Sequence, residues 1–423
     1  MNHGQFPRRP LHQKIEVEPS WPRRHRPDYA LLLIMVILIT IGLVVIYSIS
    51  PGLSQSGHVS QNYYIDKQLI AVGLGILAFT IVAAMPITLW RRIQTPLIVL
   101  AGVSAIAVRL IGQEINGAYR WIQIGGISFQ SAELIKVALL IWLAGFLSDR
   151  IRTGTLTNTK KTLYPVLACL GVLVVVVAVL QSDLGSTGVM IVMIASMVFV
   201  AGMPLKKVMT IGAIVLAILV LTVATTPYRR NRLTTFLNPT SNCLTTGYQS
   251  CQALISVGSG GMIGLGLGRS VQAYGYLPES ANDSIFAIYS EKFGFIGDVV
   301  LLGLFVFLFA RIKHIVERAP DDFTRLIAVG ILAWFSTQAL INIGAMIGLL
   351  PLKGITLPFI SYGGTSVVFV MGAVGILFQI SRYTNYQESL NNRQGEGLGY
   401  DNRLNGRRVR RPYNATASSR SRA

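Results

Sequence analysis

The stretch YALLLIMVILITIGLVVIYSIS, residues 29–50, decides the fold class of this chain. It contains no charged side chain, and about 20 apolar residues suffice for an α-helix to cross the hydrocarbon core of a bilayer. It also lacks an Ala-x-Ala-like exit, which indicates an uncleaved anchor rather than a signal peptide. Similar runs recur along the chain, which is 52% hydrophobic and 13% charged, whereas soluble domains carry about 25% charged residues. The sequence therefore predicts an all-α polytopic membrane protein.

The apolar runs and the breaks between them predict about ten transmembrane helices. The eighth run is long for one span, so its first turns are expected to lie outside the lipid. No stretch alternates as a membrane barrel strand does. The predicted spans are Tyr29–Ile49, Gln68–Leu89, Thr95–Gly112, Ala132–Leu147, Tyr164–Leu180, Ser186–Met203, Val208–Thr226, Ile285–Phe309, Leu326–Leu349 and Pro358–Ile380.

The positive charge of the chain is unevenly distributed. A net charge of +19 would suit a nucleic-acid partner, but most Lys and Arg residues fall in the terminal segments and in alternate loops. This is the bias that places basic loops on the cytoplasmic side of a membrane. Both termini of the multi-pass protein are therefore expected in the cytoplasm, and no nucleic-acid partner is expected.

The chain divides into a membrane domain and two polar tails. Residues 1–28 form a basic tail and residues 385–423 an Arg-rich tail, and both are predicted to be disordered and cytoplasmic because they cannot bury a core. Residues 29–384 form the ten-helix transmembrane domain. A large extracytoplasmic loop, residues 227–284, separates its seventh and eighth helices, and loops of this length are usually functional or disordered.

The large loop is not of low complexity. Its stretch ALISVGSGGMIGLGLG, residues 253–268, predicts a re-entrant or surface-lying segment, because glycine permits tight backbone turns and close approach to a ligand. Cys243 and Cys251 share the loop on the side where a disulfide is chemically permitted. A disulfide and two free thiols are both compatible with the sequence.

The stretch PESANDSIFAIYSEKFG, residues 278–294, places carboxylates beside an apolar run in a chain with only 18 acidic residues. Asp283 is expected at the outer entrance of the eighth span, where partial desolvation would strengthen it as a general base. From local sequence alone, a helix cap at residues 282–284 is the simpler interpretation. Glu279 is either a solvated loop charge or a substrate contact.

Arginines on the predicted outer side run against the charge bias and need another explanation. Arg120, Arg232 and Arg269 are the candidates. Guanidinium groups suit phosphate oxygens, which a pyrophosphate-linked lipid substrate would supply. Snorkelling of these side chains to lipid headgroups is the structural alternative.

Polar residues at the ends of three further spans are candidate substrate contacts. Glu133 and Lys136 are three residues apart at the start of the fourth span, so they share a helical face and form either a structural ion pair or a substrate site. Asp183, in the tight turn before the sixth span, fits either a helix cap or a substrate contact. Lys353 and Ser361 belong to the kinked entry of the tenth span, where they could meet an anionic headgroup or line a cavity.

Signatures of common soluble enzymes are missing from the sequence. It contains no Walker P-loop, no His-x-x-x-His pair and no Cys-x-x-Cys pair. The run GLGLG, residues 264–268, lacks the strand and helix that flank it in a dinucleotide-binding fold. ATP hydrolysis and a Rossmann fold are therefore not expected.

Six segments, in this order, resemble the shape, elongation, division and sporulation (SEDS) family, whose members include FtsW, RodA and SpoVE. The resemblance covers roughly residues 28–385, and the ten spans with a large outer loop before the eighth also look like the family. The segments are NGAYRWIQIGGISFQSAELIK, QSDLGSTGVM, RNRLTTFLNP, GYQSCQALISVGSGGMIGLGLGRSVQ, LPESANDSIFAIYSEKFGFIG and GLLPLKGITLPFISYGGTS.

The resemblance implies a peptidoglycan glycosyltransferase that polymerises lipid II at the outer face of the bacterial cytoplasmic membrane. Asp283 before Ser-Ile-Phe-Ala matches the family's essential aspartate and would be the catalytic base. The acceptor's 4-hydroxyl would attack the donor's anomeric carbon in one inverting displacement. Undecaprenyl pyrophosphate would leave, aided by arginines. A divalent cation, Mg²⁺ or Mn²⁺, is left open as a cofactor.

Three positions depart from the family pattern. Ala273 stands where the family often has Lys, and Arg269 is the candidate substitute. Ser131-Ala132 replaces a pair that usually contains Pro, and Glu291-Lys292 replaces paired acids. The register of Asp283 is unaffected, whereas the electrostatics of the donor site are less well defined.

Within the family, KGITLPFISYGG and ISRY resemble the division members (FtsW) more than the elongation members (RodA). This implies a location at the division septum and a class B penicillin-binding protein as partner, together with other membrane proteins of the division machinery. A RodA-type elongation polymerase is the alternative within the family.

Two other classes of function are compatible with the residues. A lipid II flippase or transporter would use the same arginines and could couple through Asp283. However, the charges gather on the outer side rather than at the span centres, with Arg109 as the exception, and this favours surface chemistry over alternating access. A structural scaffold for the division machinery predicts that Asp283→Asn leaves function intact.

Overall fold

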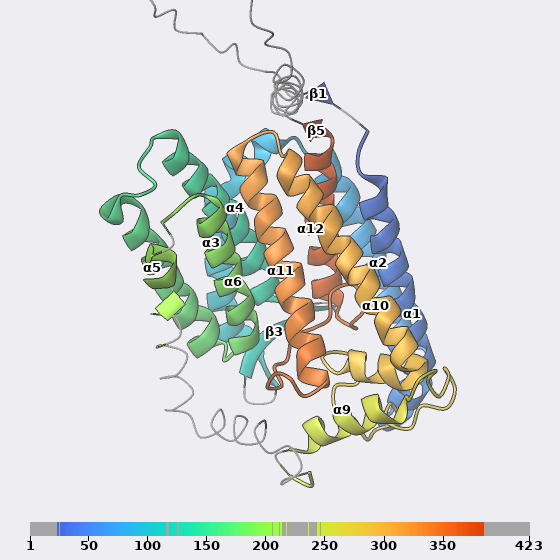
Figure 1. Ribbon diagram of the computed structural model, residues 1–423. Helices are drawn as coiled ribbons and strands as arrows, with labels where there is room; N and C mark the ends of the chain where they lie inside the picture. The colour runs from blue at the N-terminus through green and yellow to red at the C-terminus, as the bar shows by residue number, and fades with distance from the viewer. Residues whose placement is uncertain are drawn as a thin grey trace, which may run out of the picture. The chain divides into compact units, whose positions relative to one another are not determined.

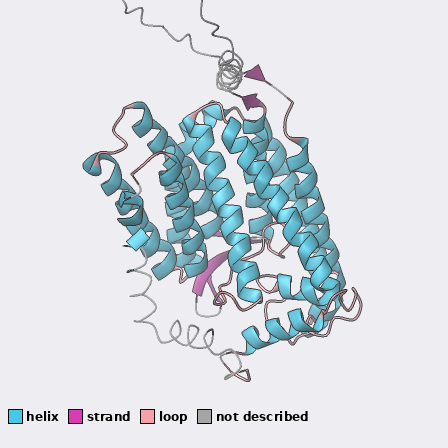
Figure 2. Cartoon of the chain, viewed as in Figure 1, coloured by secondary structure: helices cyan, strands magenta, loops and turns pink. Residues whose placement is uncertain are grey.

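The computed structural model describes residues 23–24, 26–115, 118–124, 127–204, 206–210, 212–213, 217, 236, 243–245 and 247–384. Apart from Arg23 and Thr384, all of these residues belong to one compact unit, residues 24–383. Figure 2 shows that this unit is built mainly of helices, with few and short strands. The two-residue strands β1 (Arg23–Arg24) and β5 (Tyr383–Thr384) stand at its two ends in the sequence.

Eight helices among the described residues are long and apolar enough to cross a membrane. α6 is a ninth, shorter apolar helix of 17 residues, and the seventh predicted span, Val208–Thr226, lies mostly outside the described residues. The predicted all-α polytopic membrane fold is thus confirmed. The helices (Figure 1) are α1 (Tyr29–Ser56), α2 (Tyr63–Ala84), α3 (Ile87–Ile111), α4 (Ser131–Arg152), η1 (Thr159–Leu163), α5 (Tyr164–Leu173), η2 (Val174–Leu180), α6 (Leu184–Val200), α9 (Tyr248–Ser259), α10 (Ile285–Arg318), α11 (Asp322–Met346) and α12 (Gly364–Ser381).

Several predicted boundaries were wrong, among them the start of the third helix, which lies at Ile87 rather than Thr95. The second helix begins at Tyr63 rather than Gln68, because the tyrosines of its first turn remain helical. The tenth predicted span starts at Gly364 rather than Pro358. The segment before it forms a turn, in which the backbone N–H groups of Ile360 and Ser361 donate to the carbonyl of Leu357 at 3.3 and 3.1 Å.

Carboxylates cap three of the helices. Asp28 accepts from the backbone N–H of Leu31 at 3.2 Å and so caps α1. Asp183 caps α6, and Asp321 forms a capping box with Thr324 at the start of α11. Each cap satisfies backbone donors that the first turn of a helix leaves unpaired.

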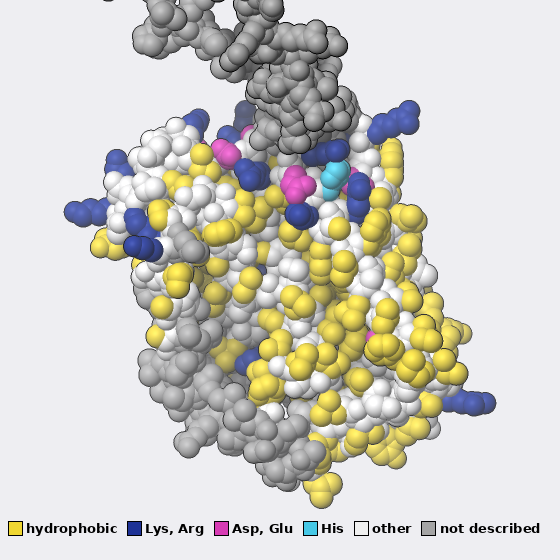
Figure 3. All heavy atoms as spheres, in the orientation of Figure 1, with side chains coloured by type: hydrophobic (Ala, Val, Ile, Leu, Met, Phe, Trp, Pro, Cys, Tyr) yellow, Lys and Arg dark blue, Asp and Glu magenta, His cyan; other side chains and the backbone are white. Residues whose placement is uncertain are grey.

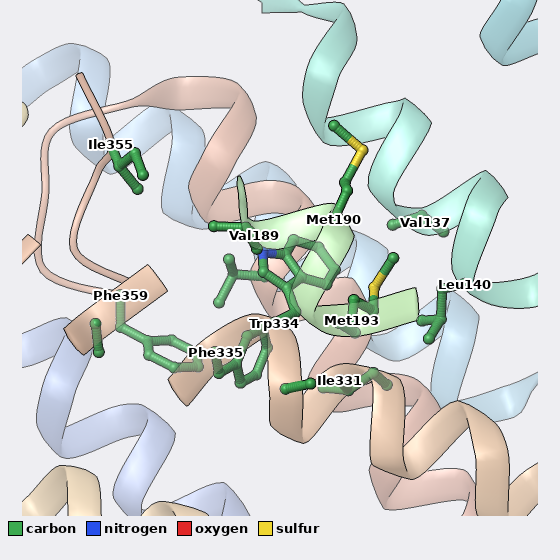
Figure 4. Packing of buried hydrophobic residues seen from close by; sticks show 14 of the residues in the cluster. Val137, Leu140, Val189, Met190, Met193, Ile331, Trp334, Phe335, Ile355 and Phe359 are labelled. Carbon is green, nitrogen blue, oxygen red and sulfur yellow. The ribbon is translucent and has the colours of Figure 1, made fainter. Parts of the chain in front are cut away.

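Helix α11 lies at the centre of the packing. It contacts α4, α6, α10 and α12, and it is the helix that carries the fully buried Trp334 and Phe335. Figure 4 shows these two rings among side chains of α4 and α6 and of the segment before α12. Their labelled neighbours there are Val137, Leu140, Val189, Met190, Met193, Ile331, Ile355 and Phe359.

A small antiparallel sheet lies between α3 and α4 in sequence. It consists of β2 (Gln113–Ile115), β3 (Ala118–Ile124) and β4 (Ile127–Gln130), with Trp121 opposite Gln130 in the register. These strands were not predicted from the sequence, because the alternation of apolar and polar residues over so few positions is a weak signal beside long apolar runs.

Charged side chains are unevenly distributed over the surface. Figure 3 shows Lys, Arg, Asp, Glu and His gathered near the end of the bundle where α10 joins α11, while the middle of the visible face is mostly hydrophobic or uncharged. An apolar belt of this kind matches the hydrocarbon core of a bilayer.

Helix α10 is interrupted at Gly294, whose backbone angles (φ 64°, ψ −169°) only glycine adopts readily. At this point the backbone of α10 bonds to the loop that follows α9. The N–H of Leu265 donates to the carbonyl of Glu291 at 2.9 Å, and the N–H of Phe295 donates to the carbonyl of Gly261 at 2.9 Å. The interruption therefore provides the backbone groups that hold the loop.

Candidate functional site

Asp283 lies in a tight turn immediately before α10. The carbonyl of Glu279 accepts from the N–H groups of Asn282 and Ser284 at 3.0 and 3.1 Å, and Glu279 itself has a positive φ of 52°. The N-cap residue of α10 is Ser284, and its side chain makes no capping bond. Asp283 is therefore held by a turn beside the helix terminus and is not its N-cap.

The segment before α12 holds the turn of Asp283 in place. Ser361 donates its hydroxyl to the carbonyl of Asn282 at 2.6 Å and accepts from the N–H of Leu357 at 2.7 Å. The N–H of Tyr362 donates to the carbonyl of Ala281 at 2.8 Å. The bonds to Asn282 and Ala281 join segments about 80 residues apart in sequence. The hydroxyl of Ser361, a predicted site residue, is engaged in internal contacts.

Arg120 and Asp283 meet at one backbone position. A Cβ atom placed on Gly354 would lie 3.6 Å from Nη1 of Arg120 and 3.7 Å from Oδ2 of Asp283. A side chain at position 354 would therefore touch both groups. The guanidinium from β3 and the carboxylate from the turn before α10 thus both border position 354.

The rest of the Arg120 guanidinium is fixed by backbone carbonyls. Its Nε donates to the carbonyl of Gln181 at 3.3 Å and its Nη2 to that of Ser182 at 2.6 Å. The next residue, Asp183, is buried and accepts from the N–H and hydroxyl of Ser186 at 2.9 and 2.8 Å. The structure thus places Asp183 beside the site, with its carboxylate engaged as the cap of α6.

Glu133 and Lys136 form a buried ion pair on α4. Lys136 Nζ lies 2.8 Å from Glu133 Oε1, and their side chains are 2% and 3% exposed. The prediction that these two residues share a helical face is confirmed. Lys136 also donates to Oε1 of Gln338 at 3.1 Å and lies 4.7 Å from the ring centroid of Trp334.

The remaining predicted site residues are dispersed. Lys353 adjoins Gly354 in the chain and is half-buried, and Glu279 is exposed and accepts from Nδ2 of Asn282 at 2.5 Å. Arg269 is exposed on the loop after α9. Arg232 lies outside the described residues.

A buried pair at the end of the first part of α10 anchors the loop that carries Arg269. Glu291 accepts from the hydroxyl of Ser270 at 2.5 Å and from the N–H of Val271 at 2.9 Å. Lys292 donates to the carbonyl of Leu267 at 2.7 Å. As expected for neighbours in sequence, the two residues bond to other groups rather than to each other.

A disulfide joins Cys243 to Cys251, so of the two alternatives left open by the sequence the structure has the bonded one. Cys251 lies in α9, which Figure 1 shows across the end of the bundle near the start of α10. The bond therefore ties the chain preceding α9 to that helix. Cys169 in α5 carries a free thiol.

Among the described residues, no three His, Cys, Asp or Glu side chains lie together in a group that could hold a metal ion. Mg²⁺ is usually held by only one or two carboxylates together with substrate phosphates and water, so a divalent cation stays a prediction.

Tyrosines of α2 pack beside the segment before α12. Tyr64 contacts Tyr362 edge to face, with ring centroids 5.4 Å apart. Burial, together with Tyr63 and Tyr64, raises the pKa of Tyr362 to about 12. The phenol of Tyr362 therefore stays protonated near neutral pH and keeps its hydrogen-bond donor.

Three buried amides near the site were missed by sequence reasoning. Gln68 donates to the carbonyl of Ser361 at 3.4 Å, and Gln338 and Asn342 bond to the segment around Gly354. Gln338 and Asn342 are four residues apart in an apolar helix, so they share a face. Polar side chains at this spacing inside a membrane span are a signal that could have identified them.

The helical bundle and its site at the α10 entrance define a polytopic helical membrane protein, and comparisons assign its family. Residues 29–386 match the model of the FtsW/RodA/SpoVE family, described as cell cycle protein. Stage V sporulation protein E of Bacillus subtilis is 37% identical over 366 residues, which are 86% of this chain and 99% of that protein. The chain belongs to the FtsW/RodA/SpoVE family.

Further relatives support this assignment. A probable peptidoglycan glycosyltransferase FtsW of Hydrogenovibrio crunogenus is 37% identical over 379 residues, 89% of this chain and 95% of that one. A chain from a structure on the coordination of polymerization and crosslinking by a peptidoglycan synthase complex superposes with a TM-score of 0.66 at 27% identity, covering 84% of this chain and 98% of that one. A mutant of the rod shape determining protein RodA of Thermus thermophilus gives 0.62 at 25% identity, with coverages of 84% and 97%.

Proposed function

We propose that this protein is a peptidoglycan glycosyltransferase that polymerises lipid II into glycan strands, with Asp283 as its catalytic base. The observation that carries the proposal is the meeting of the Asp283 carboxylate and the Arg120 guanidinium at Gly354. A base and a phosphate-binding cation that border the same backbone position suit a reaction that deprotonates a hydroxyl while an anion departs. Relatives named as probable peptidoglycan glycosyltransferases support the substrate class.

The reaction is a single displacement at the donor's anomeric carbon. The acceptor's 4-hydroxyl oxygen forms the new glycosidic bond, and its proton passes to Asp283. The bond from the anomeric carbon to the pyrophosphate oxygen breaks, and undecaprenyl pyrophosphate leaves with the electron pair. Attack opposite to the leaving group inverts the anomeric centre. No second carboxylate is needed as an acid, because pyrophosphate leaves as a stable anion.

The site is assigned to the outer face of the bacterial cytoplasmic membrane, with both termini in the cytoplasm. The charged side chains gather at the end where α10 joins α11, whereas Asp283 precedes the start of α10. Basic residues concentrate on the cytoplasmic side of membrane proteins. This distribution supports an outward orientation for Asp283, where lipid II would be used.

A class B penicillin-binding protein is the proposed partner, and the septum the proposed location. The structural relative from a complex that coordinates polymerization and crosslinking supports a partnership between polymerase and crosslinking enzyme. The relatives named FtsW support a role in division with other membrane proteins of that machinery. Depletion in the source bacterium distinguishes the roles: filamentous cells support division, and rounded cells support RodA-type elongation.

The direct test is glycan formation from purified lipid II by the protein copurified with its class B partner, with the partner's transpeptidase blocked by a β-lactam. The proposal predicts a ladder of uncrosslinked glycan strands. A parallel arm measures lipid II translocation across vesicles that contain the same protein. Translocation without polymer would contradict the proposal and favour a flippase, and the absence of both activities would favour a scaffold.

A further inference from the structure

Asn342 of α11 joins the turn of Asp283 to the segment that contains Gly354. Its side-chain Nδ2 donates to the backbone carbonyl of Asp283 at 2.8 Å and to that of Ile355 at 2.7 Å. Both partners are carbonyl oxygens, so both hydrogens of the amide are used. The side chain is 1% exposed. Removal of its amide would leave two backbone carbonyls without this hydrogen-bond donor.

Gln338, one helical turn earlier, holds the next residue of the same segment. Its Nε2 donates to the carbonyl of Thr356 at 2.9 Å and to the hydroxyl of Thr356 at 3.2 Å. Its Oε1 accepts from Nε1 of Trp334 at 2.7 Å and from Lys136 at 3.1 Å. The amide is thus bonded at both ends, and the buried ion pair of α4 fixes its orientation.

We infer that Asn342, supported by Gln338, is a positioning residue that sets the distance of the Asp283 carboxylate from Arg120. The two amides lie four residues apart and so project from one face of α11. They bond to the consecutive residues Ile355 and Thr356, which directly follow the glycine at which Arg120 and Asp283 meet. Helix α11 therefore clamps the backbone of Asp283 to the segment that follows Gly354.

The inference rests on the proposed function and identifies residues that neither touch substrate nor transfer a proton. A base must lie within hydrogen-bond reach of the hydroxyl that it deprotonates. A displacement of about 1 Å at such a group costs about 100-fold in rate even when the altered residue is remote. Loss of the clamp is therefore expected to lower kcat by about 10-fold to 100-fold and to change the KM for lipid II less than about 3-fold.

The kinetic test compares Asn342→Leu with the wild type in the complex with the class B partner. Leucine matches the size of asparagine and lacks both donors. Gln379→Met in α12 is the matched control. Gln379 is also a buried amide, 4% exposed, and it lies near the end of α12 that is farther from the segment containing Gly354. The control is expected to keep kcat within about 2-fold of the wild type, and both variants are normalised to their folded fraction.

A double-variant cycle separates positioning from general damage. If Asn342 acts through Asp283, Asn342→Leu should cost less in an Asp283→Glu background, where the carboxylate is already displaced, than in the wild type. Equal fold-losses in the two backgrounds would overturn the inference. Should Asn342→Leu fail to fold, Asn342→Ser keeps one donor and is expected to give an intermediate loss of kcat.

A labelling arm tests the clamp without relying on catalysis. The variant Asp283→Cys is made in a Cys169→Ser background, and the reaction of its new thiol with a membrane-impermeant methanethiosulfonate is timed. Asn342→Leu should change this rate several-fold, whereas Gln379→Met should not. Unchanged labelling would overturn the inference, whatever happens to kcat. Altered labelling, together with no glycan synthesis from lipid II by the complex that retains Asp283, would support the clamp and refute the proposed function.

Discussion

Replacing Lys136 with methionine should destabilise the bundle strongly. Lys136 and Glu133 are 2.8 Å apart with side chains 2% and 3% exposed. Oε2 of Glu133 is buried without a hydrogen-bond partner among the described residues. Lys136→Met would therefore leave a buried carboxylate without its cation. Removal of one partner of a buried pair costs about 3–5 kcal/mol, so the free energy of unfolding should fall by about that amount.

The double variant Glu133→Gln/Lys136→Met provides the control for this effect. It removes both charges, and neutral replacement of a buried pair is often tolerated. We expect it to recover at least half of the stability lost in Lys136→Met. Unfolding by titration with SDS in mixed micelles, followed by tryptophan fluorescence, measures all three proteins. Equal stabilities for the single and the double variant would refute the reasoning that an uncompensated charge causes the loss.

Three further variants test local features of the fold. Gly294→Ala should destabilise the protein by about 1–3 kcal/mol, because the added Cβ would meet the backbone of Gly264. The control Gly303→Ala, whose Cβ would have nothing within 4 Å, should leave the stability unchanged. The same SDS titration measures both variants. Asp183→Ala should cost about 1 kcal/mol in that titration through loss of the α6 cap, and an unchanged midpoint would contradict this. Non-reducing peptide mapping should find Cys243 bonded to Cys251, and alkylation of both would contradict the structure.

The sequence was sufficient to predict the helical membrane fold because lipid leaves few options for the backbone. Long apolar runs must form helices there, since helices satisfy their own backbone hydrogen bonds. The start of α12 was misplaced because Pro358 and Phe359 look apolar. Their segment instead forms a turn whose shape depends on the Ser361 hydroxyl reaching Asn282, 79 residues earlier.

The candidate site could be predicted only in part. Asp283 was singled out because a carboxylate beside an apolar run is unusual, its role as the base came from the match to the family's essential aspartate and stays a prediction, and the pair Glu133 and Lys136 followed from helical spacing. The bonds from Arg120 to carbonyls 61 and 62 residues away depend on packing of β3 against the turn before α6. Asn342 gave no local sign of its partners, because its bonds go to backbone carbonyls, which every residue carries.

The most direct test of the central claim is the polymerisation rate of Asp283→Asn, measured beside wild type in the complex with its class B partner. Asparagine keeps the size of the side chain but cannot take the proton. General-base catalysis contributes about 10²-fold to 10⁴-fold, so the rate should fall by at least 100-fold while the complex stays intact. Glycan formation at the wild-type rate by an equally folded Asp283→Asn complex would contradict the assignment of Asp283 as the base.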